Sequence, residues 1–147
     1  DNLYIKGRSK NIIVLSNGKK VAPQPIENRL SESPFISHVI IVGDKRSTIT
    51  AILSPHFKNL RNWVEKAGLD VDPRDNKAIV THPEVERLFK KEIERLLPDL
   101  ADFEKIRKFA IVADEFTVDN GALTPTLKVK KQVLLERYRN VIEEMYR

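Results

Sequence analysis

Two runs of β-branched and aliphatic residues, separated by a short polar turn, constrain the fold of this chain most strongly. The runs cover residues 36–42 and 48–53, and Gly-Asp-Lys-Arg-Ser at 43–47 joins them. Runs of this kind favour strands, and a short connection that contains Gly brings two strands together as a hairpin. We therefore predict an antiparallel hairpin at the centre of a sheet.

A second hairpin is predicted nearer the start of the chain. Residues 11–15 read Asn-Ile-Ile-Val-Leu, which favours a strand, and Asn17-Gly18 follows. Both of these residues accept the positive φ of a tight turn, so the pair is a strong hairpin signal. Residues 106–112 predict one further strand, and residues 117–127 predict a loop because they lack a clear periodicity.

Three segments carry helix start signals, either a cap residue or a proline in the first position: Pro23, Ser54-Pro55, and Thr81 with Glu84 in capping-box spacing. A last helix is predicted from about Val129, because apolar residues from Leu134 to Met145 fall on one helical face. Hairpins mixed with helices predict an α+β fold, with a small antiparallel or mixed sheet flanked by helices and an N-terminal β-hairpin.

The charge of the chain permits an anionic partner. Its 26 Lys and Arg residues exceed its 21 Asp and Glu residues, which gives a net charge of +5. A basic domain that binds nucleic acid is therefore a remote alternative. Aromatic residues make up only 7% of the chain and fall mainly on apolar faces, not among basic residues where they could stack on bases. We therefore expect no nucleic-acid partner.

Several kinds of site are excluded by the residue types that the sequence lacks. There is no cysteine, so disulfides and thiolate metal ligands are excluded. His38, His56 and His82 show no metal-ligand spacing, and the five glycines form neither a phosphate loop nor a dinucleotide fingerprint. We predict no metal site, no transmembrane span and no self-contained active site. The start at Asp1 resembles no signal peptide, and we expect it to be internal to a longer protein.

Two segments place cations where the chain turns. The first covers residues 7–27, with Gly7-Arg8-Ser9-Lys10 at one end, Gly18 inside it and Pro25-Ile26-Glu27 at the other end. The second covers residues 123–130, Leu-Thr-Pro-Thr-Leu-Lys-Val-Lys. The first segment resembles the hinge of the adenylate-forming enzymes and the core motif that follows it. The second segment resembles the last core motif of the same enzymes, and the two segments occur in the same order as in that family. That superfamily includes acyl-CoA synthetases, peptide-synthetase adenylation domains and beetle luciferases.

The second motif resembles one branch of this superfamily in particular. Leu127-Lys128 stands where most relatives carry Gly-Lys, and the Leu form is similar to the long-chain fatty acyl-CoA synthetases. The resemblance covers essentially the whole chain. It implies that residues 1–147 are the mobile C-terminal lid domain of an AMP-forming ligase, with the hinge and hairpin at 1–22 and an α+β body at 23–147.

The resemblance also implies a reaction. The complete ligase would use ATP to convert a fatty acid to acyl-AMP and would then transfer the acyl group to coenzyme A. Mg²⁺ would act in the parent enzyme but would not be held by this domain. The ATP and fatty-acid sites would lie in the N-terminal adenylation domain of the same polypeptide, so this domain alone would be inactive.

Three cations of the two motifs have implied roles. Lys128 would be catalytic, because its ammonium would hold the fatty carboxylate and the α-phosphate together. Arg8 would contact the ribose or phosphate of the nucleotide. Lys10 would be the hinge about which the domain rotates between the two half-reactions.

The remaining implied site residues lie on the predicted turn, where the pantetheine of coenzyme A would pass close to the backbone. They are Ser16, Asn17, Gly18 and Lys19. We expect Glu27 to be structural, and Lys130 and Lys131 to be solvated residues at the start of a basic helix.

The acceptor and the acyl chain length stay open. A fatty acyl-AMP ligase that delivers to a carrier protein, and a medium-chain acyl-CoA synthetase, are alternatives that keep the fold. We expect a cytoplasmic protein and leave peripheral contact of the parent with a membrane open.

Overall fold

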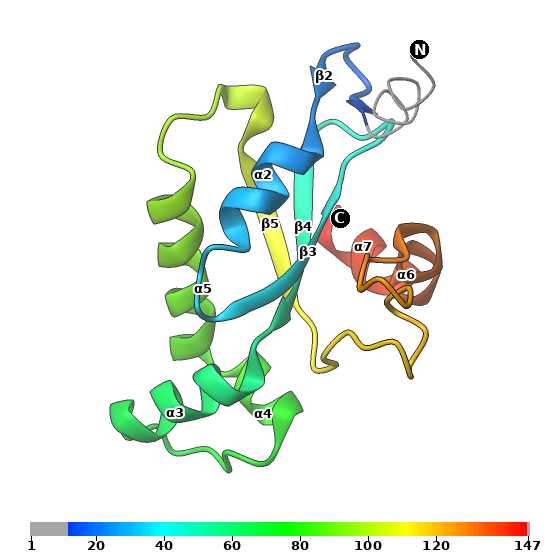
Figure 1. Cartoon of the computed structure of the whole chain (residues 1–147). Coiled ribbons are helices and arrows are strands. Elements are labelled where there is room, and N and C mark those ends of the chain that lie inside the picture. Colours follow the sequence, from blue (N-terminus) through cyan, green and yellow to red (C-terminus); the bar gives the residue numbers. More distant parts are fainter. Residues whose placement is uncertain (1–11, 147) are drawn as a thin grey trace.

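A three-stranded mixed sheet forms the centre of the computed structural model, which describes residues 12–146. Its strands are β3 (Ile36–Val42), β4 (Ile49–Pro55) and β5 (Ile106–Ile111), in the order β3-β4-β5 (Figure 1). β3 and β4 pair antiparallel, which confirms the predicted hairpin. β5 lies parallel to β4 on its other side, so the sheet is mixed.

Alternate residues of β3 and β4 enter different cores, because successive side chains of a strand point to opposite faces. Ile41 and Leu53 belong to the larger core. Ile40 and Ile52 belong to a smaller core on the other face of the sheet. The near-continuous apolar runs in the sequence therefore reflect a sheet that is covered on both sides.

Helices cover the larger core. They are α2 (Pro23–Leu30), α3 (Phe57–Ala67), α4 (Asn76–Thr81) and α5 (Pro83–Leu96). Each contributes buried apolar side chains, among them Leu30, Phe57, Ile79 and Phe89. Together with a short 3-10 helix at Asp102–Glu104, the three α-helices between β4 and β5 form the connection that a parallel strand pair requires.

Two of the predicted helix starts are wrong. β4 continues through Pro55, and α3 is capped by His56, whose side chain accepts the Asn59 N–H at 3.4 Å. Thr81 ends α4, and His82 caps α5 by accepting the Glu84 N–H at 3.0 Å. The sequence prediction looked for hydroxyl and carboxylate caps, whereas here a ring nitrogen satisfies the first free N–H groups.

Two short helices cover the smaller core, where one helix from about Val129 was predicted. α6 covers Lys131–Arg137 and α7 covers Arg139–Met145, and the two are separated at Tyr138. The buried Tyr138 hydroxyl donates to the Asp114 carboxylate at 3.1 Å, and burial and this carboxylate raise the pKa of Tyr138 to about 12. The helix is interrupted where this side chain is anchored.

The N-terminal hairpin is confirmed, and it packs on the body of the domain. β1 (Ile13–Val14) pairs antiparallel with β2 (Lys20–Val21), and both strands supply side chains to the larger core. In the turn, Gly18 alone has positive φ, at 88°. The Ser16 N–H also donates to the Arg46 carbonyl at 2.8 Å, which joins the hairpin to the β3–β4 turn.

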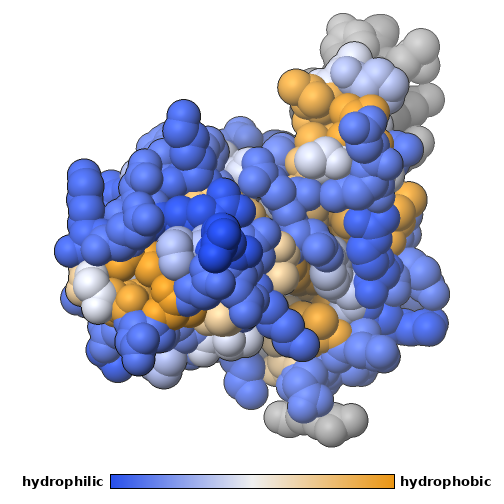
Figure 2. Space-filling view, turned by 90° about the horizontal axis from the view of Figure 1, so that it is seen from below, coloured by the Kyte–Doolittle hydropathy of each residue, from blue (hydrophilic) through white to orange (hydrophobic). Residues whose placement is uncertain are grey.

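In Figure 2 hydrophilic residues dominate the visible face, and apolar residues show in separate areas. Between residues 12 and 146, no helix combines the length and the apolar character that crossing a membrane requires.

Candidate functional site

The predicted catalytic residue, Lys128, is exposed at the end of a tight loop. The loop is closed by the Thr124 N–H, which donates to the Lys128 carbonyl at 2.8 Å, and by the Leu127 N–H, which donates to the Thr124 carbonyl at 2.8 Å. The Lys128 N–H in turn donates to the Thr124 hydroxyl at 3.1 Å. Leu123 and Val129 form a β-bridge at its base. These contacts close the loop that carries the Lys128 ammonium.

The segment before this loop is pinned to the sheet although it has no strand of its own. The buried Ser54 hydroxyl of β4 donates to the Asp114 carbonyl at 3.1 Å and accepts the Phe116 N–H at 3.3 Å. Asn120 closes a turn with Thr117, since its side chain accepts the Thr117 N–H at 3.1 Å. The predicted loop is thus an ordered connection that places Lys128.

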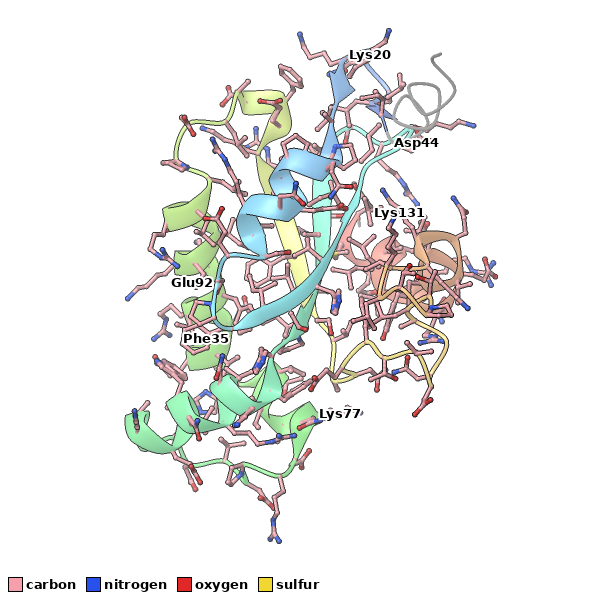
Figure 3. The ribbon with its side chains drawn as sticks, in the orientation of Figure 1. Lys20, Phe35, Asp44, Lys77, Glu92 and Lys131 are labelled. Carbon is pink, nitrogen blue, oxygen red and sulfur yellow. The ribbon has the colours of Figure 1, made fainter. Side chains whose placement is uncertain are left out.

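Lys128 borders a cavity of about 490 Å³ between α2, β3 and the start of α6. Its lining residues are Pro23, Gln24, Glu27, Val39, Ile40, Lys128, Val129 and Lys131. Figure 3 shows Lys131 at the start of α6, beside β3. The expectation of a solvated Lys131 is wrong, because this residue is half-buried on the cavity wall.

Glu27 is the acidic group of this cavity. Its carboxylate accepts the Ile41 N–H at 3.1 Å, on the edge strand β3. Burial raises the pKa of Glu27, and the Ile41 hydrogen bond and the positive charge of Lys131 oppose this shift. The cavity therefore combines two lysines with one carboxylate that is partly desolvated, a setting suited to an anionic ligand.

The second predicted site, the turn from Ser16 to Lys19, has the same hydrogen-bond pattern as the Lys128 loop. The Leu15 N–H donates to the Lys19 carbonyl at 2.8 Å, and the Gly18 N–H donates to the Leu15 carbonyl at 2.9 Å. Both are three-residue hairpin turns whose third residue is left-handed. In each, a lysine follows the left-handed residue.

Sequence reasoning missed the surroundings of this turn. Asn17 borders a small cavity of about 210 Å³ together with Phe103, Lys105 and Arg107, which lie at and before the start of β5. The Lys19 ammonium lies over the Phe103 ring, 5.2 Å from its centroid. The sequence did contain a sign of this basic region, because three basic residues cluster at 105–108. Nothing in the sequence, however, indicated that they lie close to residue 17.

The two turns lie on different parts of the domain. In Figure 1 the β1–β2 hairpin is at the top, whereas the connection from β5 to α6 lies lower, beside α6 and α7. Arg8 and Lys10 lie outside the described residues. In the part of the chain from 12 to 146, no three His, Cys, Asp or Glu side chains form a group that could hold a metal ion.

Comparison with known proteins assigns this arrangement to a family. A family model described as the AMP-binding enzyme C-terminal domain matches residues 10–147. The chain is 34% identical over 148 residues to the long-chain-fatty-acid–CoA ligase FadD15 of Mycobacterium tuberculosis, covering 98% of this chain and 24% of the relative. It is 32% identical over 147 residues to human long-chain-fatty-acid–CoA ligase 6, covering 98% of this chain and 21% of the relative.

Solved structures agree on the fold. The adenylation domain of a carboxylate reductase from Mycobacterium chelonae matches with a TM-score of 0.72 and 23% identity, over 95% of this chain and 20% of that one. The chain therefore spans only about a fifth to a quarter of the length of the proteins it matches.

Proposed function

Since the chain belongs to the family of AMP-binding enzyme C-terminal domains, we propose that it is the C-terminal domain of a long-chain-fatty-acid–CoA ligase. The complete enzyme activates a fatty acid with ATP to acyl-AMP and passes the acyl group to coenzyme A. The names of the relatives support the substrate class. The observation that carries the proposal is Lys128, exposed on a hydrogen-bonded loop beside a cavity that suits an anion.

In the adenylation step, Lys128 brings two anions together. Its ammonium contacts the fatty carboxylate and the α-phosphate of ATP, and it offsets negative charge that grows in the transition state. A point charge on a flexible stem suits this role, while the backbone bonds to Thr124 keep its origin fixed. Arg8 contacts the nucleotide through the ribose or phosphate.

In the thioester step, the domain rotates about Lys10 and presents the other turn to the active site. The pantetheine of coenzyme A passes the backbone of residues 16–19. Lys105, Arg107 and Asp102 border the adjacent cavity, and Lys105 is paired with Asp102 at 3.3 Å, so Arg107 is the cation that suits a phosphate of coenzyme A. The separation of the two turns on the domain supports a scheme in which each half-reaction uses its own face.

The missing part of the parent supplies the rest of the site. The N-terminal adenylation domain of the same polypeptide holds ATP, the fatty acid and Mg²⁺, and this domain acts as its mobile lid, with the hinge and hairpin at 1–22. We place the parent in the cytoplasm, with peripheral membrane contact left open. Transfer to a carrier protein, or a medium-chain substrate, would keep the roles given to Lys128, Arg8, Lys10 and the turn at 16–19.

The test uses the full-length parent with Lys128→Ala. Removing one preorganised charge contact typically costs about 10²–10³ in rate, so ATP–pyrophosphate exchange should fall by about that factor. The thioester step, measured with premade acyl-adenylate and coenzyme A, should stay nearly intact. Lys128→Arg should not restore exchange fully, because the planar guanidinium cannot place a point charge in the same position.

The matched control is Lys130→Ala, two residues along the chain and also exposed. It should change neither half-reaction by more than about twofold, as is usual for a surface substitution. If the thioester step of Lys128→Ala falls as far as exchange does, Lys128 is a general structural residue and the proposal for it is wrong. Replacing coenzyme A by a carrier protein in the same assay identifies the acceptor.

A further inference from the structure

Leu127 combines an unfavourable backbone conformation with an unusually exposed apolar side chain. Its φ is 65°, in the left-handed region, where a residue with a Cβ is strained. Its side chain has a relative exposure of 64%, the highest among the large hydrophobic residues at 12–146. The next most exposed of these residues, Val133, reaches 45%. Both features disfavour leucine at this position.

The chain itself shows which residue this turn favours. The turn at 15–19 has the same two backbone hydrogen bonds, and its left-handed position is occupied by Gly18, with φ 88°. Glycine takes this conformation without a steric cost, and asparagine tolerates it better than leucine. The turn geometry alone therefore does not explain the leucine at 127.

The strained conformation is held by its neighbours. Thr124 accepts the Leu127 N–H with its carbonyl and the Lys128 N–H with its hydroxyl. The Leu123–Val129 bridge fixes both ends of the loop to the smaller core. A residue kept in a sparsely populated conformation by surrounding structure is a feature of functional sites. Here the result is an apolar side chain that projects from the loop next to Lys128.

We propose that Leu127 is a docking residue, which seats the 124–128 loop against an apolar surface of the N-terminal domain in the adenylation orientation. The inference rests on the proposed function, because that function brings Lys128 to the missing domain, and Leu127 is its direct neighbour. Most of the parent lies outside this chain, which spans 21–24% of its relatives. Burial of the leucine on docking offsets its exposure and strain in the undocked domain.

The test replaces Leu127 with glycine and with asparagine. Leu127→Gly removes the side chain and the strain, and Leu127→Asn keeps a similar size but makes it polar. Both should raise the Tm of the 147-residue chain, by roughly 2 °C for a domain of this size. In the full-length parent both should lower ATP–pyrophosphate exchange by about tenfold or more, the equivalent of losing one buried leucine contact. Transfer from premade acyl-adenylate to coenzyme A should be unchanged.

Val118→Asn is the matched control, because Val118 is also an exposed apolar residue of the same connection. It should leave pyrophosphate exchange within about twofold of wild type. If Leu127→Gly stabilises the chain and exchange stays within the same range, the leucine is merely tolerated and the inference is overturned. A defect that grows with the length of the acyl chain would place Leu127 on the substrate and overturn it too. A wild-type parent without any fatty-acid-dependent exchange would refute the proposed function instead.

Discussion

Glu27 has two opposing effects on the stability of the fold. Its carboxylate accepts the Ile41 N–H and so satisfies a donor on the edge strand. Burial raises its pKa, which means that ionisation is less favourable in the folded chain than in the unfolded chain. The stabilising contribution of Glu27 is therefore fully present below its unfolded pKa and is lost as pH rises through the folded pKa.

Substitutions at Glu27 should separate the two effects. Glu27→Gln keeps an acceptor for Ile41 and removes the charge, so it should be at least as stable as wild type at pH 7. Its advantage over wild type should shrink as pH falls through the raised folded pKa of Glu27, and it should be gone below the unfolded pKa. Glu27→Ala leaves the Ile41 N–H without this partner and should cost about 1–3 kcal/mol. Urea unfolding at several pH values measures the stability of both variants. Equal stability of the Ala and Gln variants would contradict the proposed role of the Ile41 hydrogen bond.

At the scale of elements, some features of the fold depend on residues that are adjacent in the sequence, and others depend on contacts between distant residues. The hairpins follow from residues adjacent in the chain, and they were predicted. The break at Tyr138 coincides with a hydrogen bond to Asp114, which is 24 positions away, and the periodicity across 134–145 gives no sign of it. The parallel placement of β5 likewise depends on packing of the three helices that precede it.

The candidate site divides in the same way. Lys128 and the turn at 16–19 were predictable, because each belongs to a short contiguous motif. The cavity beside Lys128 was not, since Glu27 and Lys131 come from helices far apart in the sequence. The same holds for Lys105 and Arg107 beside Asn17. Motifs thus identified the turns, and only the folded chain identified their partners.

A substitution at Ser54 tests whether contact with β4 keeps the connection after β5 ordered. Ser54→Ala removes the hydroxyl that binds both Asp114 and Phe116, so the buried Phe116 N–H and the Asp114 carbonyl lose a partner. The change should cost about 1–3 kcal/mol. Hydrogen exchange should accelerate first in residues 113–123, and exchange in α3 should follow only the change in global stability.

Ser47→Ala, in the exposed β3–β4 turn, is the control for this experiment. It should leave exchange in residues 113–123 as it is in wild type. A uniform acceleration across all elements in Ser54→Ala would mean that the connection unfolds only with the whole domain. In that case Ser54 contributes to global stability and does not order this segment separately.

At the scale of the whole molecule, the 147-residue chain should fold without its parent but should not catalyse the reaction. The sheet carries a core on each face, and within residues 12–146 no buried side-chain polar atom lacks a hydrogen-bond partner. Thermal unfolding should therefore be cooperative. ATP- and coenzyme-A-dependent thioester formation should be undetectable, with the full-length parent as the positive control. Measurable product from the chain alone would contradict the assignment of the ATP and fatty-acid sites to the missing domain.

Rotation of the whole domain should depend on the backbone at Lys10. Lys10→Pro in the full-length parent fixes φ near −65° and restricts Ser9 as well, so the chain loses the torsions that a hinge needs. We expect the parent to stay in the adenylation orientation, with ATP–pyrophosphate exchange retained and transfer to coenzyme A lost. Lys10→Ala removes the charge but leaves the torsions free, and it should retain both half-reactions. Equal loss of both in Lys10→Pro would argue against Lys10 as the pivot, and equal loss in Lys10→Ala would mean that the ammonium itself acts in the site.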